Sequence, residues 1–433
     1  MDPKLKEAKL KNLKSTRKIF IVLTILLIFN FIGMFLPLPD RIHEGKTLLP
    51  VILAPRVALA DEYCQDTIQS NIFETEDCTT PAEQPPVINA LSAVVMDLDT
   101  GRVLFEKNAY KRMPMASTTK IMTAIVAIEN GNLDDEVTVS KLASGIWGSV
   151  IDLYEGEKIK HQDLLYGLML SSGNDAAIAI AEHVGGSLEN FLEMMNQKAR
   201  LIGARNTSFK SPHGLDKEGH YSTAYDLAIM TAYALNNPVF SKIVGTKSIT
   251  IGGNRSFYNT NEMLDMYPGT NGVKTGYTGQ AGRCLVTSVN RDGRRLVSVV
   301  LNCPSRSVRA ISSKKILDYA FNNYTNYTLQ EAGEIIASLP VVKGLEDSVK
   351  VGTAEKVVLP LRHDELERLE KKVLLHESLE APVYAGMDVG QIKFMLDEKV
   401  LAECVLKTWA DVQRKDFRYY IELIIKQWLK LTD

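Results

Sequence analysis

A serine and a lysine three positions apart, Ser117 and Lys120, form the first pattern in this sequence that could carry out covalent chemistry. An almost wholly apolar run, IMTAIVAIE, follows them and predicts a buried helix starting near Ser117, with both side chains on one face. The positive end of the helix dipole favours loss of the ammonium proton, and a neutral amine beside a hydroxyl gives an activated nucleophile. The pattern is weak by itself, because it recurs at Ser15–Lys18 and Ser312–Lys315 and a serine there often only caps a helix.

A second polar pattern, Ser172-Gly173-Asn174, interrupts two apolar stretches that predict buried helices, LLYGLML and DAAIAIAEHV. Its polar groups should therefore reach the edge of a cleft. A hydroxyl and an amide two positions apart can relay a proton and hold a substrate carbonyl. A plain turn between helices is the simpler explanation when the segment is taken alone, and a similar pair at Ser288–Asn290 ends a strand.

A third pattern, Lys274-Thr275-Gly276, lies in the stretch GTNGVKTGYTGQAG. A phosphate-binding loop is excluded, because that motif needs glycine directly before the lysine and Val273 occupies this position. Val273 suits the edge of a strand instead. Lys274 would then supply a fixed positive charge, Thr275 a hydroxyl, and Gly276 room for a substrate backbone to lie close to the strand.

The three patterns follow one another in the order Ser-x-x-Lys, Ser-x-Asn, Lys-Thr-Gly, which is the motif set of penicillin-binding proteins and serine β-lactamases. The segments PMASTTKIMTA, LMLSSGNDAA and VKTGYTGQAG resemble those of low-molecular-mass penicillin-binding proteins, the serine D-alanyl-D-alanine carboxypeptidases. SPHGLD (211–216) and HYSTAYDLA (220–228) are also similar, and the β-rich region 332–405 resembles the C-terminal domain of that family. The resemblance covers about residues 87–433.

This resemblance implies a hydrolase that removes the terminal D-Ala from peptidoglycan stem pentapeptides and is acylated by β-lactam antibiotics, with no cofactor and no metal. The implied catalytic residues are Ser117, which attacks the penultimate D-Ala carbonyl, Lys120, which takes the serine proton, and Ser172, which relays it to the leaving amine. The implied substrate-binding residues are Asn174, Lys274, Thr275, Gly276, Tyr277 and Arg309.

The resemblance also divides the binding work. Lys274 and Thr275 would hold the terminal carboxylate, with Arg309 matching a family arginine nearby, and Asn174 would bind the peptide. The backbone N–H groups of Ser117 and Tyr277 would form the oxyanion hole. Tyr277 stands where the family often has histidine, so only the backbone role of this position is carried over.

The elements that must position these groups predict a mixed α/β fold. The stretch AVVMDLDTGRVLFEK predicts a hairpin, residues 141–245 are mostly helical, and residues 272–303 contain three β-rich pieces. The sequence therefore predicts an antiparallel sheet made from both ends of the domain with a helical insertion, the fold of the penicillin-binding and β-lactamase-like transpeptidases. Short, regularly spaced strands then predict a small all-β sandwich.

Five segments are predicted along the chain. They are a cytosolic basic leader with a transmembrane or signal segment (1–60), a linker (61–86), the serine D,D-peptidase catalytic domain (87–331), the β-sandwich domain (332–405) and a C-terminal amphipathic membrane-associating helix (406–433).

The N-terminal segment indicates export. The apolar run 19–37 is long enough to cross a bilayer, and its basic flank should stay in the cytosol, so we expect the enzyme on the extracytoplasmic face of a bacterial cell membrane. An Ala58-Leu59-Ala60 pattern leaves a cleaved signal and a retained anchor equally open. Cys64 and Cys78 could pair outside the cell, but no disulfide is predicted.

Composition excludes two classes of partner. The 433-residue chain has 50 Lys and Arg against 52 Asp and Glu, so it lacks the basic excess of a nucleic-acid-coating protein. Its five cysteines show no paired zinc spacing and its seven histidines lack the HExxH pattern, so no metal site is predicted.

The last 23 residues predict a helix from Asp411 to Leu431. Its apolar stripe recurs at helical spacing and consists of Phe417, Ile421, Ile424, Trp428 and Leu431. The opposite side is basic, and charges interrupt the helix too often for it to span a bilayer. We therefore expect an in-plane helix on a membrane surface, with docking on the β-sandwich as the alternative.

Four other functions share parts of this sequence pattern. A β-lactamase needs a general base for deacylation, for which Glu193 is the only faint candidate. A D,D-endopeptidase or transpeptidase shares all three motifs, whereas a non-catalytic wall-binding protein would have lost one of them. A zinc D,D-peptidase built on His213, Asp216 and His220 is conceivable, but that stretch is more similar to the serine family.

Overall fold

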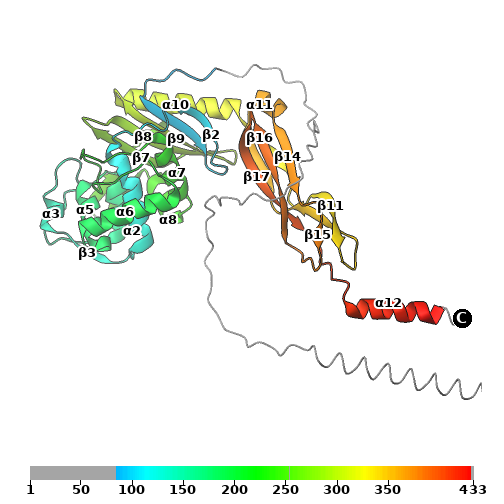
Figure 1. Ribbon diagram of the computed structural model, residues 1–433. Helices are drawn as coiled ribbons and strands as arrows, with labels where there is room; N and C mark the ends of the chain where they lie inside the picture. The colour runs from blue at the N-terminus through cyan, green and yellow to red at the C-terminus, as the bar shows by residue number, and fades with distance from the viewer. Residues whose placement is uncertain (1–83, 253, 431–433) are drawn as a thin grey trace, which may run out of the picture. The chain divides into compact units, whose positions relative to one another are not determined.

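The structure is a computed structural model that describes residues 84–252 and 254–430 (Figure 1). The predicted basic leader, the apolar run 19–37, the cleavage pattern at 58–60, and Cys64 and Cys78 lie outside the described residues, as does nearly all of the predicted linker. Within the described ranges, no helix is both long enough and apolar enough to cross a membrane.

A five-stranded antiparallel sheet forms the centre of the catalytic domain, in the strand order β2-β1-β9-β8-β7. Its strands are β1 (Ser92–Asp97), β2 (Val103–Lys107), β7 (Thr270–Thr278), β8 (Gly282–Arg291) and β9 (Arg294–Cys303). Because β1 pairs with β9, the two ends of the domain close a single sheet, and the predicted fold class is confirmed.

Strand β1 is buried on both faces, which explains the apolar stretch AVVM at its centre. Val94 and Met96 belong to the core on one face, whereas Ala93 and Val95 belong to the core on the other. Helix α10 (Arg306–Asn323) packs against the second face, and the helical insertion supplies the first core (Figure 1). The sheet is therefore the middle layer that fixes β7 at its edge.

The insertion between β2 and β7 surrounds one central helix, α2 (Lys120–Asn130), whose first eight residues are all buried. Its other elements are the 3-10 turn η1 (Ala116–Thr119), β3 (Glu136–Thr138), α3 (Lys141–Ser144), β4 (Lys158–Lys160), α4 (His161–Met169), α5 (Asn174–Gly185), α6 (Leu188–Ile202), α7 (Ala224–Leu235), α8 (Pro238–Gly245), β5 (Ser248–Ile251), β6 (Arg255–Tyr258) and α9 (Met263–Met266).

The helix predicted to start near Ser117 begins with a tighter turn. Ser117 lies in η1, and the α-helix itself starts at Lys120. The hydroxyls of Thr118 and Thr119 donate to the carbonyl oxygens of residues 115 and 116, at 2.6 and 2.8 Å, and so hold the turn closed. The hydroxyl of Ser117, within the same turn, lies 3.1 Å from the Nζ of Lys120.

The C-terminal β-domain has its own hydrophobic core. A six-stranded sheet in the order β14-β16-β17-β12-β11-β15 is accompanied by the two-stranded pair β10-β13. The elements are β10 (Thr325–Gln330), β11 (Ile335–Val342), β12 (Ser348–Thr353), β13 (Val357–Leu361), α11 (His363–Glu367), β14 (Glu370–Leu375), β15 (Leu379–Glu380), β16 (Asp388–Leu396) and β17 (Lys399–Thr408).

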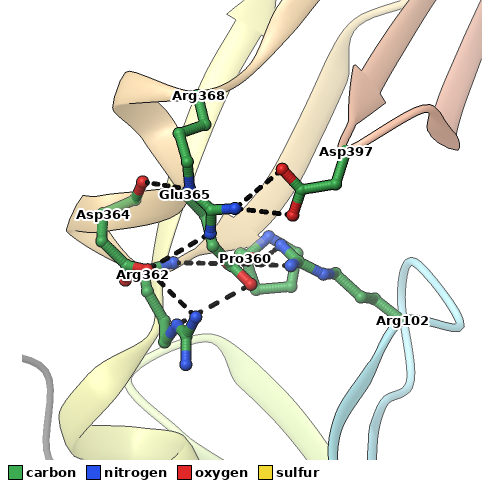
Figure 2. Close-up of polar contacts among 7 residues, drawn as sticks. All are labelled: Arg102, Pro360, Arg362, Asp364, Glu365, Arg368 and Asp397. Carbon is green, nitrogen blue, oxygen red and sulfur yellow. Dashed lines mark hydrogen bonds and ion pairs between the residues drawn. The ribbon is translucent and has the colours of Figure 1, made fainter.

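A nearly buried ion pair joins the two domains (Figure 2). Arg102, directly before β2, donates to Glu365 of α11 at 2.8 Å and to the backbone carbonyl of Pro360. Glu365 also accepts from the backbone N–H of Arg362 at 3.0 Å. The side chains of Arg102 and Glu365 are only 11% and 8% exposed, so this contact is sheltered from water.

The last helix, α12 (Phe417–Lys430), starts six residues later than the predicted Asp411. The preceding segment is extended because it pairs with the β-domain. Val412 is buried and bridges to Val383, and Leu345 donates its backbone N–H to the carbonyl of residue 413 at 2.7 Å. From residue 417 to 429 the helix has no buried residue.

Candidate active site

Lys120 lies at the centre of the site and is completely buried. Its Nζ lies 3.1 Å from the Ser117 Oγ, 2.7 Å from the Asn174 Oδ1 and 2.8 Å from the backbone carbonyl of His213. Three successive parts of the catalytic domain, η1–α2, the start of α5 and the loop before α7, therefore converge on one amine.

The pKa of Lys120 is lowered well below its ordinary value of 10.5. Burial is the main cause, the positive charge of Lys274 adds to it, and Asp175 acts in the opposite direction. Asp175 is prevented from pairing with the lysine, since its carboxylate accepts backbone N–H groups from Ile151 at 2.9 Å and Leu153 at 3.1 Å. The sequence prediction of a neutral amine beside a hydroxyl thus has a physical basis, although burial, and not the helix dipole, is its main source.

The two residues of the Ser-x-Asn pattern take different positions. Asn174 accepts from Lys120 and donates its Nδ2 to the carbonyl of Trp147 at 2.8 Å, so both ends of its amide are already engaged by protein. Ser172 lines the cleft, and its φ of 64° is unusual for a residue other than glycine. Of the two, it is Ser172 that faces the cleft and Asn174 that holds the lysine.

Strand β7 brings the Lys-Thr-Gly pattern to the other side of the cleft. Lys274 is buried, donates to the Thr275 carbonyl at 3.2 Å, and has its pKa lowered to about 7 by burial and then by Arg309. Its charge is therefore not fixed near neutral pH, contrary to the sequence expectation. The hydroxyl of Thr275 shares a hydrogen bond of 2.7 Å with that of Thr260.

Gly276 allows β7 to lie directly against η1. A Cβ at this position would lie 3.0 Å from the Cβ of Ala116 and 3.1 Å from the backbone nitrogen of Ser117. The contact places the Ser117 N–H beside the strand that carries Tyr277, as the proposed oxyanion hole requires. Tyr277 itself is 55% exposed.

Arg309 reaches the cleft from α10, but it is not free. Its guanidinium binds both oxygens of Glu262 at 2.9 and 2.7 Å, and its side chain is 4% exposed. A carboxylate of the substrate would therefore meet an arginine that is already paired, so its contribution differs from that of a free cation.

A cleft of about 710 Å³ collects these groups. Six of the nine predicted site residues line it, namely Ser117, Ser172, Thr275, Gly276, Tyr277 and Arg309. The other three, Lys120, Asn174 and Lys274, are buried behind its wall. The structure thus brings together all nine residues, in two layers.

Sequence reasoning missed the residues that orient this wall. Thr260 holds the Thr275 hydroxyl, Glu262 holds Arg309, and Asp175 anchors the loop that carries Ser149 into the cleft. The acid directly after Asn174 was a visible signal for the third, because a buried aspartate at a helix start needs backbone donors. No sequence pattern around Thr260 or Glu262 indicated that these residues would orient the site.

Residues named for two alternative functions lie in other environments. Glu193 is exposed on α6 and bonds Gln197 and Arg200, and it does not line the cleft. His213 accepts from the Leu215 N–H, and His220 accepts from the Lys210 N–H and contacts the Thr119 hydroxyl. In the described part of the chain no group of three or more His, Cys, Asp or Glu is arranged to hold a metal ion.

Comparison with known proteins identifies the family of the chain. The sequence model of the D-alanyl-D-alanine carboxypeptidase family matches residues 79–305, and the model of the penicillin-binding protein 5 C-terminal domain matches residues 324–414. The chain belongs to the D-alanyl-D-alanine carboxypeptidase family.

The similarity extends over nearly the whole length of individual relatives. The chain is 36% identical to D-alanyl-D-alanine carboxypeptidase DacF of Bacillus subtilis over 79% of this chain and 90% of the relative. It is 30% identical to DacA of Escherichia coli over 88% of this chain and 99% of the relative. Among solved structures, penicillin-binding protein 5 from Haemophilus influenzae is similar with a TM-score of 0.69 at 33% identity, covering 77% of this chain and 100% of that one.

Proposed function

We propose that the cleft is the active site of a serine D-alanyl-D-alanine carboxypeptidase, with Ser117 as nucleophile and Lys120 as its base. The observation that carries this proposal is the distance of 3.1 Å between the Ser117 hydroxyl and a buried amine whose pKa is strongly lowered. Family membership supplies the substrate class, a peptide ending in D-Ala-D-Ala.

The contacts of Lys120 suit a neutral amine. Its two N–H groups have acceptors in the Asn174 side chain and the His213 carbonyl, at 2.7 and 2.8 Å. Its lone pair then faces the Ser117 hydroxyl, the one contact that can donate to it. Asn174 is thus a residue that orients the base, in addition to any contact with the peptide.

Acylation of Ser117 and hydrolysis of the acyl-enzyme then follow. Ser117 Oγ attacks the carbonyl of the penultimate D-Ala while its proton passes to Lys120. Ser172, the hydroxyl that lines the cleft, relays that proton to the nitrogen of the terminal D-Ala, which leaves as the free amino acid. Water hydrolyses the resulting ester, which returns the shortened peptide and free Ser117.

Strand β7 contributes binding and electrostatics. The N–H groups of Ser117 and Tyr277 would stabilise the developing oxyanion, and the hydroxyl of Thr275 would bind the terminal carboxylate. Lys274 and Arg309 add positive potential behind that carboxylate. A β-lactam offers the same carbonyl and carboxylate, so it should acylate the same serine.

Substitution of Ser117 tests the assignment. Ser117→Ala should abolish both D-Ala release and covalent labelling by penicillin, whereas Ser312→Ala, at the other exported Ser-x-x-Lys pattern, should retain both. Mass spectrometry of the intact protein after penicillin gives the readout. A covalent adduct on the Ser117→Ala protein would overturn the proposal.

The place of action is a second proposal. The family acts on peptidoglycan, so this enzyme works outside the cytoplasm. We propose that α12 lies on the outer surface of the cell membrane through its apolar side. The absence of buried residues from 417 to 429 favours this over docking on the β-domain, and Phe417, Ile424 and Trp428 are 71, 61 and 69% exposed.

Liposome co-sedimentation separates the two possibilities. A chain of residues 84–433 should sediment with anionic vesicles, and a chain ending at residue 416 should stay in the supernatant, since it keeps the paired segment around Val412 but lacks the helix. Neutral vesicles and added salt test the basic side of the helix. If both chains remain soluble, the helix does not bind membranes.

A further inference from the structure

One end of the cleft carries more positive charge than the carboxylate of D-Ala requires. Arg283, Arg306 and Arg309 all line it, with Glu262 as the acid among them. Glu262 is fully used by Arg309, which binds both of its oxygens. Within residues 84–252 and 254–430, no ion pair includes Arg283 or Arg306.

The strand register places Arg283 on the same side as the residue expected to bind the terminal carboxylate. In the β7–β8 pair, Thr275 lies opposite Leu285 and Tyr277 lies opposite Arg283. Leu285 belongs to the core under α10. Because side chains alternate along a strand, Thr275, Tyr277 and Arg283 all face the α10 side of the sheet.

Arg283 is held in place without losing its donors. Its guanidinium carbon lies 3.6 Å from the centre of the Tyr277 ring. Stacking on an aromatic face fixes the position of a guanidinium while its N–H groups stay available at the edge. A half-exposed tyrosine at this position therefore acts as a platform for the cation.

Arg306 stands where a cation is electrostatically disfavoured. It is the first residue of α10, an 18-residue helix whose first turn contains no acid and also contains Arg309. The positive end of the helix dipole adds to the charge of these arginines. An arrangement that lowers stability and lines a cleft is typical of a site that binds an anion.

We propose that Arg283 and Arg306 form a second anion-binding subsite. This subsite favours a leaving residue that carries an anionic group in addition to its α-carboxylate. The inference rests on the proposed function: the scissile carbonyl lies at Ser117 and the terminal residue extends past Thr275. Arg283 and Arg306 line the same cleft as Thr275, so an anionic side chain on that terminal residue would have these two cations within the cleft that holds it.

Two kinds of peptide carry an additional anionic group on the leaving side. One ends in an acidic D-residue in place of D-Ala, and the other is a D,D-cross-linked dimer whose leaving strand bears a further carboxylate. The first would make the enzyme a carboxypeptidase with a wider range of leaving residues, and the second would give it endopeptidase activity.

The test compares peptides that differ only in one charge. Diacetyl-L-Lys-D-Ala-D-Glu and its D-Gln counterpart have nearly the same shape, so the ratio of their kcat/KM values isolates the charge. We expect the wild-type protein to prefer D-Glu by about tenfold, the worth of one charge-assisted hydrogen bond, and to lose this preference in added salt. Release of D-Ala from the D-Ala-D-Ala peptide by the wild-type protein checks the proposed function separately.

The variants assign the preference to the two arginines. The ratio should fall for Arg283→Gln and for Arg306→Gln and approach one in the double variant, whereas Arg283→Lys should keep part of it. The control Arg205→Gln removes an exposed arginine outside the cleft and should keep the full ratio. Thermal unfolding of each variant checks that the fold is intact.

The outcomes are distinct. A wild-type ratio of one or below, or a ratio unchanged in the double variant, overturns the subsite even if D-Ala release is normal. No D-Ala release by the wild-type protein would instead overturn the proposed function. If the D-Glu preference holds, cleavage of a cross-linked dimer that falls in the double variant identifies cross-links as substrates, and no cleavage of the dimer identifies an acidic terminal residue.

Discussion

The catalytic cleft and the junction of Figure 2 both bury cations, but they treat the charge in opposite ways. At the junction, Arg102 meets Glu365 at 2.8 Å. In the cleft, Lys120 and Lys274 are 0 and 1% exposed, and among the described residues neither forms an ion pair with a carboxylate.

The difference shows that a buried cation can serve either stability or chemistry, depending on whether it is paired. A paired cation has its charge compensated and holds two segments together, because breaking the pair would leave the other charge buried alone. An unpaired cation has its pKa moved toward neutrality, as the pKa directions of Lys120 and Lys274 show, and a neutral amine can accept a proton. The cleft gives up stability to obtain this chemistry, and the junction contributes stability alone.

The largest effect expected from this comparison is the loss of the base. Lys120→Met should lower kcat/KM for D-Ala release by at least about 10³-fold and slow penicillin acylation to a similar extent, because Ser117 loses the acceptor of its proton. The matched control is Lys315→Met, which removes the exposed lysine of the other Ser-x-x-Lys pattern. Activity within tenfold of wild type after Lys120→Met would identify a different base.

Acid should weaken the fold around the cleft. Burial lowers the pKa of His213 to about 3 and that of His220 to about 4. Above pH 6.5 both histidines are neutral in either state. Below pH 6.5 the unfolded chain binds protons that the folded chain does not, so stability falls as the pH drops from about 6.5 toward 4.

Urea unfolding at a series of pH values measures this slope. At pH 4.5 each histidine should have lowered the free energy of unfolding by on the order of 2 kcal/mol relative to its value above pH 6.5. His213→Asn keeps an acceptor for the Leu215 N–H and should flatten the slope, whereas His363→Gln, at a partly exposed histidine, should not. Equal slopes in all three proteins would show that the buried histidine does not control the acid response.

The junction should respond in stability and not in chemistry. Arg102→Met removes the closer of the two cations paired with the nearly buried Glu365 and leaves only Arg362 at 3.7 Å, so it should cost about 1 to 2 kcal/mol, while kcat on a D-Ala-D-Ala peptide stays near wild type. Adding Glu365→Leu should recover part of the loss, since the buried carboxylate that has lost its closer partner is then gone. Calorimetry and steady-state kinetics on the same samples decide it, and a large loss of kcat with unchanged unfolding would reverse the roles of the two regions.

Sequence predicted the parts of this picture that depend on residue type and spacing. The serine and lysine at positions 117 and 120 are one turn apart, and the hairpin and strand patterns around them fix the sheet. It did not predict that Glu262 would occupy Arg309 or that Asn174 would be used by Lys120 and Trp147, because these contacts join segments 47, 54 and 27 residues apart. The late start of α12 has the same origin, since Val412 and Arg414 form bridges with the distant residues Val383 and Gly344 of the β-domain.

The smallest effect concerns a neutral group of the cleft, the hydroxyl of Thr275. The hydroxyl of Thr275 is oriented by that of Thr260 at 2.7 Å and should donate to the terminal carboxylate, while the charge comes from the arginine and lysine behind it. Thr275→Val should therefore lower kcat/KM on the acid peptide by about tenfold, the value of a single charge-assisted hydrogen bond. On a peptide whose terminal carboxylate is amidated, wild-type activity should already be low, and the same substitution should change it little. Thr250→Val, at an exposed threonine of β5, is the control and should leave both rates unchanged. If Thr275→Val lowers both rates equally, the hydroxyl acts on the backbone of the substrate, and the charges of the cleft read the carboxylate without its help.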